Sequence, residues 1–177
     1  SYNTFIGAEA GKGGQTSAPF SSGEYNTVVG SEALKNFTTA NYNVAIGYQA
    51  AEDFTTATRM VAIGYEAMTD VTTGADSVAI GYQAAYYDVG TDSVSIGSYA
   101  GMANAGGSNV SIGFRAGSTS TGNSNTAIGW SAMRYLNAGN QNVAIGNTAG
   151  SYLLGTSTTI VGSQAGRFAS GSYNTFV

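Results

Sequence analysis

Apolar and small residues alternate in a short phrase that returns along the whole chain, as in Asn142-Val143-Ala144-Ile145-Gly146. Val or Thr stands three residues before the Gly and Ile or Val stands one residue before it, with a small residue between them through most of the chain. Alternation with a period of two is typical of a β-strand. Each copy of the phrase therefore predicts one short strand that ends at a Gly.

The spacing of the copies predicts how these strands are arranged. After a first interval of 23 residues, which contains an insertion at residues 11–24, the copies follow one another every 16 or 17 residues. This period is too short for two packed helices and indicates an all-β, parallel β-solenoid of about ten coils, forming a single repeat domain over residues 1–177. The Gly residues that define the copies are Gly7, Gly30, Gly47, Gly64, Gly81, Gly97, Gly113, Gly129, Gly146 and Gly162.

The columns one and three residues before the Gly share one face of the predicted strand. Because they carry Ile and Val, we expect this face to form the core stripe of the solenoid. The Ile residues of this predicted core are Ile46, Ile63, Ile80, Ile96, Ile112, Ile128 and Ile145.

The opposite face of the strand is small through the middle of the chain. Small side chains allow a neighbouring backbone to approach closely, so we expect this face to meet another chain. The alternative is that a thin solenoid cannot fit anything larger there. The Ala residues of this predicted subunit interface are Ala45, Ala62, Ala79, Ala127 and Ala144.

Three further columns have structural interpretations. Ala stands three places after the Gly in all ten copies, which predicts a position too tight for a larger side chain. Asn dominates four places before the Gly, as expected where Asn shapes a turn or stacks along parallel strands. We expect apolar residues in the variable stretch to close the coil from the other side, with paired Thr columns on a second strand or its turn; these apolar residues are Phe37, Phe54, Val71, Leu136 and Leu153.

Two features are candidate binding surfaces. Aromatic residues follow the Gly directly at Tyr48, Tyr65, Tyr82, Phe114 and Trp130. If exposed they form a platform for sugar rings or a partner chain, and if buried they pack between subunits, which is the interpretation we favour. The insertion, with Lys12, Phe20 and the only Pro, is a second candidate because loops on rigid scaffolds often carry binding sites, although such loops are also simply tolerated.

The composition argues against catalysis. The chain has no His and no Cys, and its only Lys residues are Lys12 and Lys35, so no nucleophile with a general base can be assembled. We predict no catalytic residue, no cofactor and no metal site. Asp53 and Asp70 share a column and would suit Ca²⁺, but the nonapeptide pattern of calcium-binding rolls is missing.

The charges are unevenly placed along the chain. All ten acidic residues lie between Glu9 and Asp92, with three basic residues beside them, whereas only Arg115, Arg134 and Arg167 follow, giving −7 and +3 for the two parts. The rod is thus predicted to be electrically polar, which favours head-to-tail association. The alternative is that the uneven charge only reflects sequence drift in exposed loops. The overall acidity argues against nucleic acid. No apolar stretch is long enough to predict membrane insertion.

The repeats resemble those of a known family. Asn43-Val44-Ala45-Ile46-Gly47 and Ser77-Val78-Ala79-Ile80-Gly81 are similar to the head repeat of the YadA-like trimeric autotransporter adhesins, and Asn125 to Ala132 is similar to repeats in tail fibres of phages and contractile injection systems. The resemblance implies a left-handed β-roll with two short strands per coil, three chains around an axis, and attachment at a cell or virion surface. The period of 16 to 17 and the invariant Ala differ from the adhesin pattern and favour the fibre type.

Three hypotheses for function follow. The first is an extracellular, homotrimeric fibre or adhesin segment that binds a surface receptor or glycan. The second is a structural spacer or filament unit, because both ends show the same phase of the repeat without a cap and copies would join end to end. The third is ice binding by the Thr columns Thr38, Thr55, Thr72 and Thr39, Thr56, Thr73.

Overall fold

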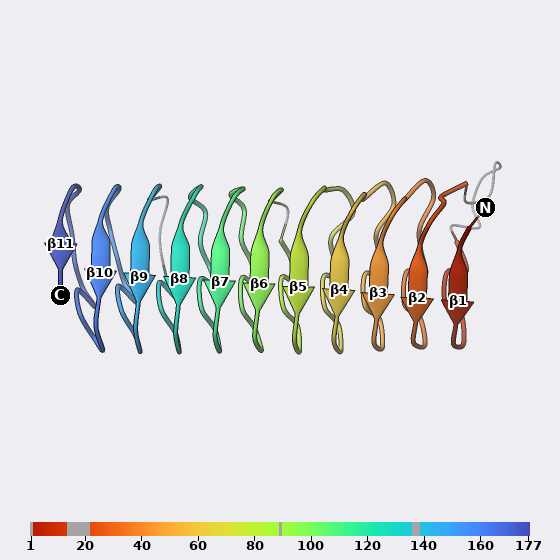
Figure 1. Cartoon of the computed structure of the whole chain (residues 1–177), viewed down its shortest axis with the longest axis horizontal. Coiled ribbons are helices and arrows are strands. Elements are labelled where there is room, and N and C mark those ends of the chain that lie inside the picture. Colours follow the sequence, from red (N-terminus) through yellow and green to blue (C-terminus); the bar gives the residue numbers. More distant parts are fainter. Residues whose placement is uncertain (1, 14–21, 89, 136–138) are drawn as a thin grey trace.

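The chain forms a rod in which every coil adds one strand to a single parallel sheet (Figure 1). The computed structural model describes residues 2–13, 22–88, 90–135 and 139–177. Within them it contains eleven strands and no helix, which confirms the predicted all-β solenoid. The strands are β1 (Thr4–Ile6), β2 (Thr27–Val29), β3 (Val44–Ile46), β4 (Val61–Ile63), β5 (Val78–Ile80), β6 (Val94–Ile96), β7 (Val110–Ile112), β8 (Thr126–Ile128), β9 (Val143–Ile145), β10 (Thr159–Val161) and β11 (Thr175–Phe176).

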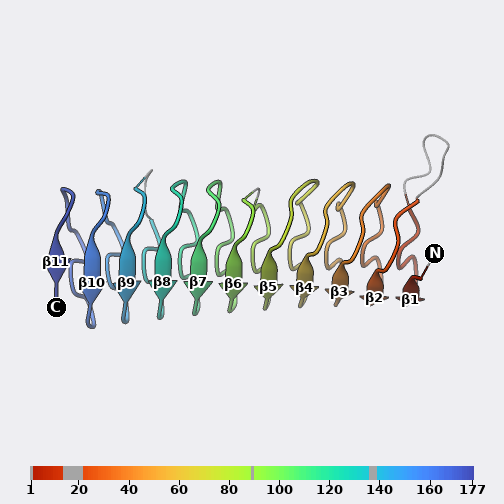
Figure 2. The same ribbon diagram turned by 45° about the horizontal axis from the view of Figure 1, so that its top comes forward.

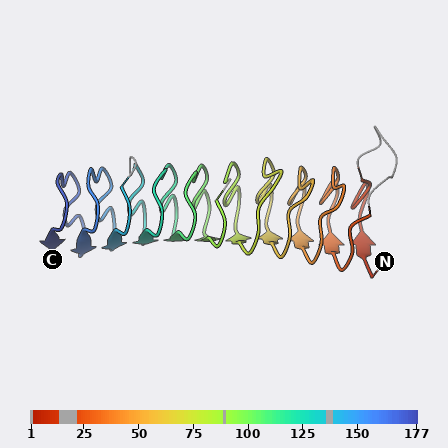
Figure 3. The same ribbon diagram turned by 90° about the horizontal axis from the view of Figure 1, so that it is seen from above.

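The order of the strands in the sheet is their order in the sequence. Each strand pairs in register with the next, so that Val44, Ala45 and Ile46 of β3 face Val61, Ala62 and Ile63 of β4. The strands line one side of the rod and the connecting segments lie on the other (Figures 2 and 3). Position along the sequence is therefore position along the rod.

The two faces of the strands are the reverse of the sequence prediction. Ala45, Ala62, Ala79 and Ala144 are fully buried and Ala127 nearly so, which places the small column inside the coil, where it cannot form a subunit interface. The Ile column is on the outer face, with Ile46, Ile80, Ile96 and Ile145 between 36% and 40% exposed and Ile63, Ile112 and Ile128 half-buried. The alternative explanation, limited space in a thin solenoid, accounts for the small residues.

The interior is filled from the segments that follow the Gly. The predicted tight Ala column is buried in the eight coils from Ala33 to Ala149. The apolar residues expected to close the coil are also buried at Phe37, Phe54, Val71 and Leu153, while Leu136 lies outside the described residues. Beside them Leu34, Met68 and Met133 are buried at the next position after the Ala. These side chains occupy the space in which an inward-facing Ile would have to fit.

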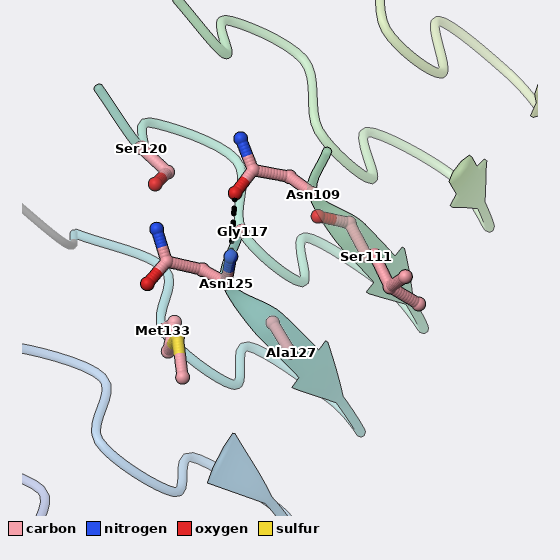
Figure 4. Close-up of a pocket in the computed structure, with 8 residues that line it drawn as sticks. Asn109, Ser111, Gly117, Ser120, Asn125, Ala127 and Met133 are labelled. Carbon is pink, nitrogen blue, oxygen red and sulfur yellow. Dashed lines mark hydrogen bonds between the residues drawn. The ribbon is translucent and has the colours of Figure 1, made fainter. Parts of the chain in front are cut away.

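The core is interrupted by polar side chains near the middle of the rod. One hydrophobic cluster spans coils from Val28 to Ala85 and a second spans coils from Ala116 to Ala169. Between them Asp88, Asn104 and Ser120 occupy the buried column that holds Phe54 and Leu153 elsewhere. Figure 4 shows part of this region between β7 and β8; the space there, lined by residues that include Asn109, Ser120 and Met133, leaves no room for a water molecule.

The Asn column forms a buried ladder, as predicted. The Asn26 Oδ1 accepts hydrogen bonds from the backbone N–H of Asn43 (3.0 Å) and from its Nδ2 (3.1 Å), and the Asn43 Nδ2 also donates to the carbonyl of Ala57 (2.9 Å). The same contact joins the Asn109 Oδ1 to the N–H of Asn125 (2.9 Å; Figure 4). The ladder satisfies backbone groups that no strand pairs.

The second strand implied by the resemblance is reduced to isolated bridges. Among the described residues these join Asn41 to Thr58, Thr58 to Ala75, and Leu154 to Ser170. Successive coils are nevertheless hydrogen-bonded on that side too, for example from the N–H of Thr56 to the carbonyl of Thr72 (3.2 Å). The paired Thr residues lie outside any strand, in bends or irregular backbone.

Candidate binding surfaces

The outer face of the sheet is an apolar strip. The two outward columns carry Val or Thr and Ile or Val in every complete strand, and no charged residue interrupts them. At about 4.8 Å per strand the strip from β2 to β10 is roughly 40 Å long. Contiguous exposed apolar surface of this kind marks interaction sites in soluble proteins.

The aromatic column is exposed on the single chain and forms a continuous ladder. Tyr48 stacks on Tyr65 (ring centroids 5.2 Å apart) and Tyr65 on Tyr82 (5.3 Å). Tyr82 meets Tyr99 edge to face (5.2 Å), and the ladder continues through Phe114 to Trp130, which are 6.0 Å apart. Trp130 is half exposed, at 50%, and the three predicted Tyr residues are 40% to 46% exposed.

Tyr99 is a member of the ladder that the sequence prediction missed. It stands two places after Gly97, whereas the other members directly follow their Gly, and Ser98 holds the expected place. The signal was present in the sequence as an aromatic displaced by one position. Its ring bridges the Tyr82 and Phe114 coils because the intervening coil has no other aromatic there.

Near the N-terminal end, charged side chains on the segment after the Gly form ion pairs with one another. The Lys35 Nζ lies 2.9 Å from the Glu32 Oε2, 3.4 Å from Glu9 and 3.6 Å from Glu52. The hydrogen bond from Lys35 lowers the pKa of Glu32 and raises the pKa of Lys35 itself. Burial raises the pKa of Glu52, despite the nearby ammonium group. Three carboxylates share two ammonium groups here, so the cluster keeps a net negative charge and does not suit an anionic ligand.

Near the middle of the rod, the segments that follow β6, β7 and β8 form a hollow of about 240 Å³. Three successive coils contribute to it. Its lining residues are Tyr99, Met102, Arg115, Ser118, Thr119, Arg134 and Tyr135. The sequence prediction identified none of them as a site, because it treated the three C-terminal Arg residues only as a contribution to axial polarity.

Asp88 is the one acidic residue among those described that is fully buried. Its Oδ1 accepts a hydrogen bond from the backbone N–H of Gly90 (2.7 Å). Burial raises its pKa to about 7, because the charged form loses hydration that one hydrogen bond replaces only in part. This group titrates near neutral pH inside the polar interruption of the core.

The remaining predicted features are less organised. Lys12 is exposed and paired with Glu9 (3.1 Å), while Phe20 lies outside the described residues. The hydroxyls of Thr38 and Thr55 donate to the carbonyls of Thr55 and Thr72 (2.8 Å each), so these donors are already used within the chain. Over the ranges listed for the fold, no three acidic side chains gather closely enough to hold a metal ion.

The part of the chain that the structure describes includes no helix suited to crossing a bilayer. Comparisons of the chain with protein-family models, with curated proteins and with solved structures find no match.

Proposed function

We propose that the chain is a segment of an extracellular attachment fibre or adhesin that works as a homotrimer, like the YadA-like heads and tail fibres that its repeats resemble. The observation that carries this proposal is the outward-facing row of Ile and Val along the sheet. A single chain leaves this row in water, at a cost of about 25 cal/mol for each Å² of apolar surface. Association of copies through the strip removes that cost.

Three copies around an axis parallel to the rod suit this surface. The strip is straight and runs the length of the sheet, so copies in the same register present matching columns to one another. Closed rotational symmetry then covers every strip without leaving one free to recruit further chains. The aromatic ladder supplies three equivalent surfaces for a receptor or glycan, and multivalency turns weak single contacts into useful avidity.

The first test is the solution mass of the 17.9 kDa chain by light scattering at several concentrations. The expected mass is that of three chains. The double variant Ile80→Asn/Ile96→Asn is expected to fall to one chain with its strand circular dichroism retained, since both side chains point outward. Thr56→Asn, an exposed change away from the strands, is the control. A wild-type monomer at all concentrations would refute the trimer.

The second test concerns attachment. Tyr65→Ser/Trp130→Ser removes two exposed rings from the ladder. If the ladder contacts the receptor, this variant keeps the wild-type mass and loses binding to cells that the wild-type protein coats. Unchanged attachment by the trimeric variant would exclude the ladder as the contact surface.

A filament is the second candidate, favoured by the separation of charge along the rod. All acidic residues precede Arg115, and sequence order is axial order (Figure 1). Unlike charges at opposite ends favour head-to-tail contacts that salt weakens. In light scattering this candidate predicts a mass that climbs with concentration and falls with added salt, whereas the trimer predicts a constant mass.

A further inference from the structure

The hollow in the coils of β6 to β8 exists because a row of large side chains is interrupted. Six places after the Gly, the last three coils carry Tyr135, Tyr152 and Phe168, whose rings stack at 4.8 and 5.2 Å. The two coils before them carry Ala103 and Thr119 at this place. The surface is therefore recessed over a length of two coils, or about 10 Å along the rod, beside the exposed end of an aromatic stack.

The hollow is positively charged and has no acidic counterpart. Arg115 and Arg134 both line it, and no Asp or Glu occurs after Asp92. Among the described residues neither guanidinium has an ion pair; the contacts of both are with aromatic rings. In the N-terminal coils the same positions carry Lys35 with its three Glu partners. The two cations are thus available to an external anion.

The aromatic contacts hold both guanidinium groups at the rim. The Arg115 Cζ lies 5.3 Å from the centre of the Tyr99 ring and 5.2 Å from that of Phe114, and the Arg134 Cζ lies 4.7 Å from that of Tyr135. Cation–π contacts at this range favour these positions without using the N–H donors. An arriving carboxylate or sulfate can then accept hydrogen bonds in the bidentate geometry that guanidinium favours.

The floor offers polar groups that suit a hydroxylated ligand. The Thr119 hydroxyl donates to the carbonyl of Arg134 (2.8 Å), as does the Ser118 hydroxyl (3.4 Å), which leaves both oxygens as acceptors. Tyr99 and Tyr135 add ring surface beside them. At about 240 Å³ the hollow is smaller than the sites of drug-sized ligands, which start near 300 Å³, and matches a single ring.

From these observations we propose that the hollow binds one acidic sugar residue. Its carboxylate or sulfate pairs with Arg115 and Arg134, its ring packs against the Tyr side chains, and its hydroxyls donate to Ser118 and Thr119. The site is built by one chain and lies on the segment after the Gly, where it shares Tyr99 with the aromatic ladder. It goes beyond the proposed attachment function, and it does not depend on trimer formation.

The test compares matched probes by NMR titration of the whole chain. Glucuronic acid and glucose differ at one carbon, glucose 6-sulfate exchanges carboxylate for sulfate, and inorganic sulfate is the anion alone. We expect glucuronic acid or glucose 6-sulfate to bind at least about tenfold more tightly than glucose and than inorganic sulfate. Equal binding of glucuronic acid and glucose overturns the role of the Arg pair. Equal binding of inorganic sulfate overturns the sugar specificity, and no binding by any probe overturns the site.

Three variants locate the binding. Arg115→Gln and Arg134→Gln are each expected to weaken the acidic sugar about tenfold or more. Arg167→Gln is the matched control, because Arg167 occupies the same column as Arg134 and contacts a ring (5.1 Å to Phe168) but does not line the hollow. If Arg167→Gln weakens binding of the acidic sugar equally, the effect comes from the net charge of the chain and the proposal is overturned.

A fourth variant removes the space and keeps the charge. Thr119→Tyr extends the column that already contains Tyr135 and Tyr152, so the chain is expected to fold and to keep its oligomeric state. Binding of the acidic sugar is expected to be lost with both Arg residues in place. Undiminished binding would show that the hollow is not the site. Because the mass of the oligomer is read separately, failure here does not bear on the trimer.

Discussion

At the scale of single residues, the Gly that follows each strand from β1 to β9 is set by two constraints at once. Gly97 has φ of +127°, and a Cβ on it would lie 2.7 Å from the carbonyl oxygen of Gly113 in the next coil. The first constraint is local strain and the second is a clash between coils. Together they explain why the repeat keeps this residue while the positions around it vary.

Gly97→Ala is expected to destabilise the chain more than Gly162→Ala. Gly162 has nearly the same φ, +131°, but a Cβ there would meet only ordinary contacts, the nearest being the Ala165 Cβ at 3.5 Å. The strain of about 1–3 kcal/mol is common to both variants, and the clash is added only at Gly97. Urea unfolding followed by circular dichroism measures the difference. Equal losses would mean that backbone strain alone retains the Gly.

Asp88 makes stability depend on pH in an unusual direction. Its pKa is about 7 in the fold against 3.8 in an ordinary environment, so between these values the folded state binds more protons than the unfolded state. Stability therefore falls as the pH rises from about 4 to about 7. Asp88→Asn keeps an acceptor for the Gly90 N–H and removes this loss, up to about 4 kcal/mol at pH 8.

The measurement is thermal unfolding of both proteins at pH 4 and pH 8. We expect similar melting temperatures at pH 4 and a higher one for Asp88→Asn at pH 8. Asp76→Asn is the control, because the hydrogen bond from Arg59 lowers the pKa of Asp76 and this carboxyl therefore causes no loss of stability between pH 4 and pH 8. If Asp88→Asn loses stability with rising pH as the wild type does, Asp88 does not control the slope.

At the scale of the element, each three-residue strand has a small inner face and a large outer face. Ala79 is fully buried between Ala62 and Ser95 of the adjacent strands, whereas Ile80 is 37% exposed. Ala79→Ile is therefore expected to overpack the coil, at about 1–3 kcal/mol or more, and to reduce strand circular dichroism. Ile80→Ala is expected to retain the strand signal, whatever its effect on mass. The opposite result would restore the predicted Ile core.

These two faces also show how far the sequence could lead. The period, the strand positions, the tight Ala column and the Asn ladder were predictable because each follows from spacing or residue chemistry alone. Which face of the strand points inward was not predictable, because alternation shows which residues share a face but not which face is inside. That depends on whether side chains such as Phe54 and Met68, far from the strand along the coil, already fill the interior.

The candidate sites also differ in whether the sequence predicts them. Tyr48, Tyr65 and Tyr82 form a column in the sequence, and the structure places them in an exposed stack. The hollow could not be predicted from one column, because it arises where Thr119 interrupts the aromatic residues six places after the Gly and is lined as well by the columns two and five places after the Gly. Such a site can be recognised only when equivalent positions of successive coils, 16 or 17 residues apart in the sequence, are placed next to one another.

At the scale of the whole molecule, each coil contacts the coil before it and the coil after it. The strand contacts are confined to consecutive pairs from β1 to β11, and the ladder and turn hydrogen bonds join adjacent coils as well. Stability in such a rod is approximately a sum of coil and neighbour terms. The number of coils then sets the length of the rod and does not decide whether it folds.

Deletion of residues 65–81, one full repeat, is therefore expected to give a folded rod shorter by about 4.8 Å in small-angle scattering. Gly64 then joins Tyr82 in the same phase, so Tyr48 stacks on Tyr82, and Arg59 meets Asp92 in place of Asp76. Deletion of residues 65–73 is the control, because half a repeat sets the next Ala and Gly columns against the wrong neighbours. If both deletions unfold, the coils cooperate over the whole rod; if both fold, the register of the columns does not specify the structure.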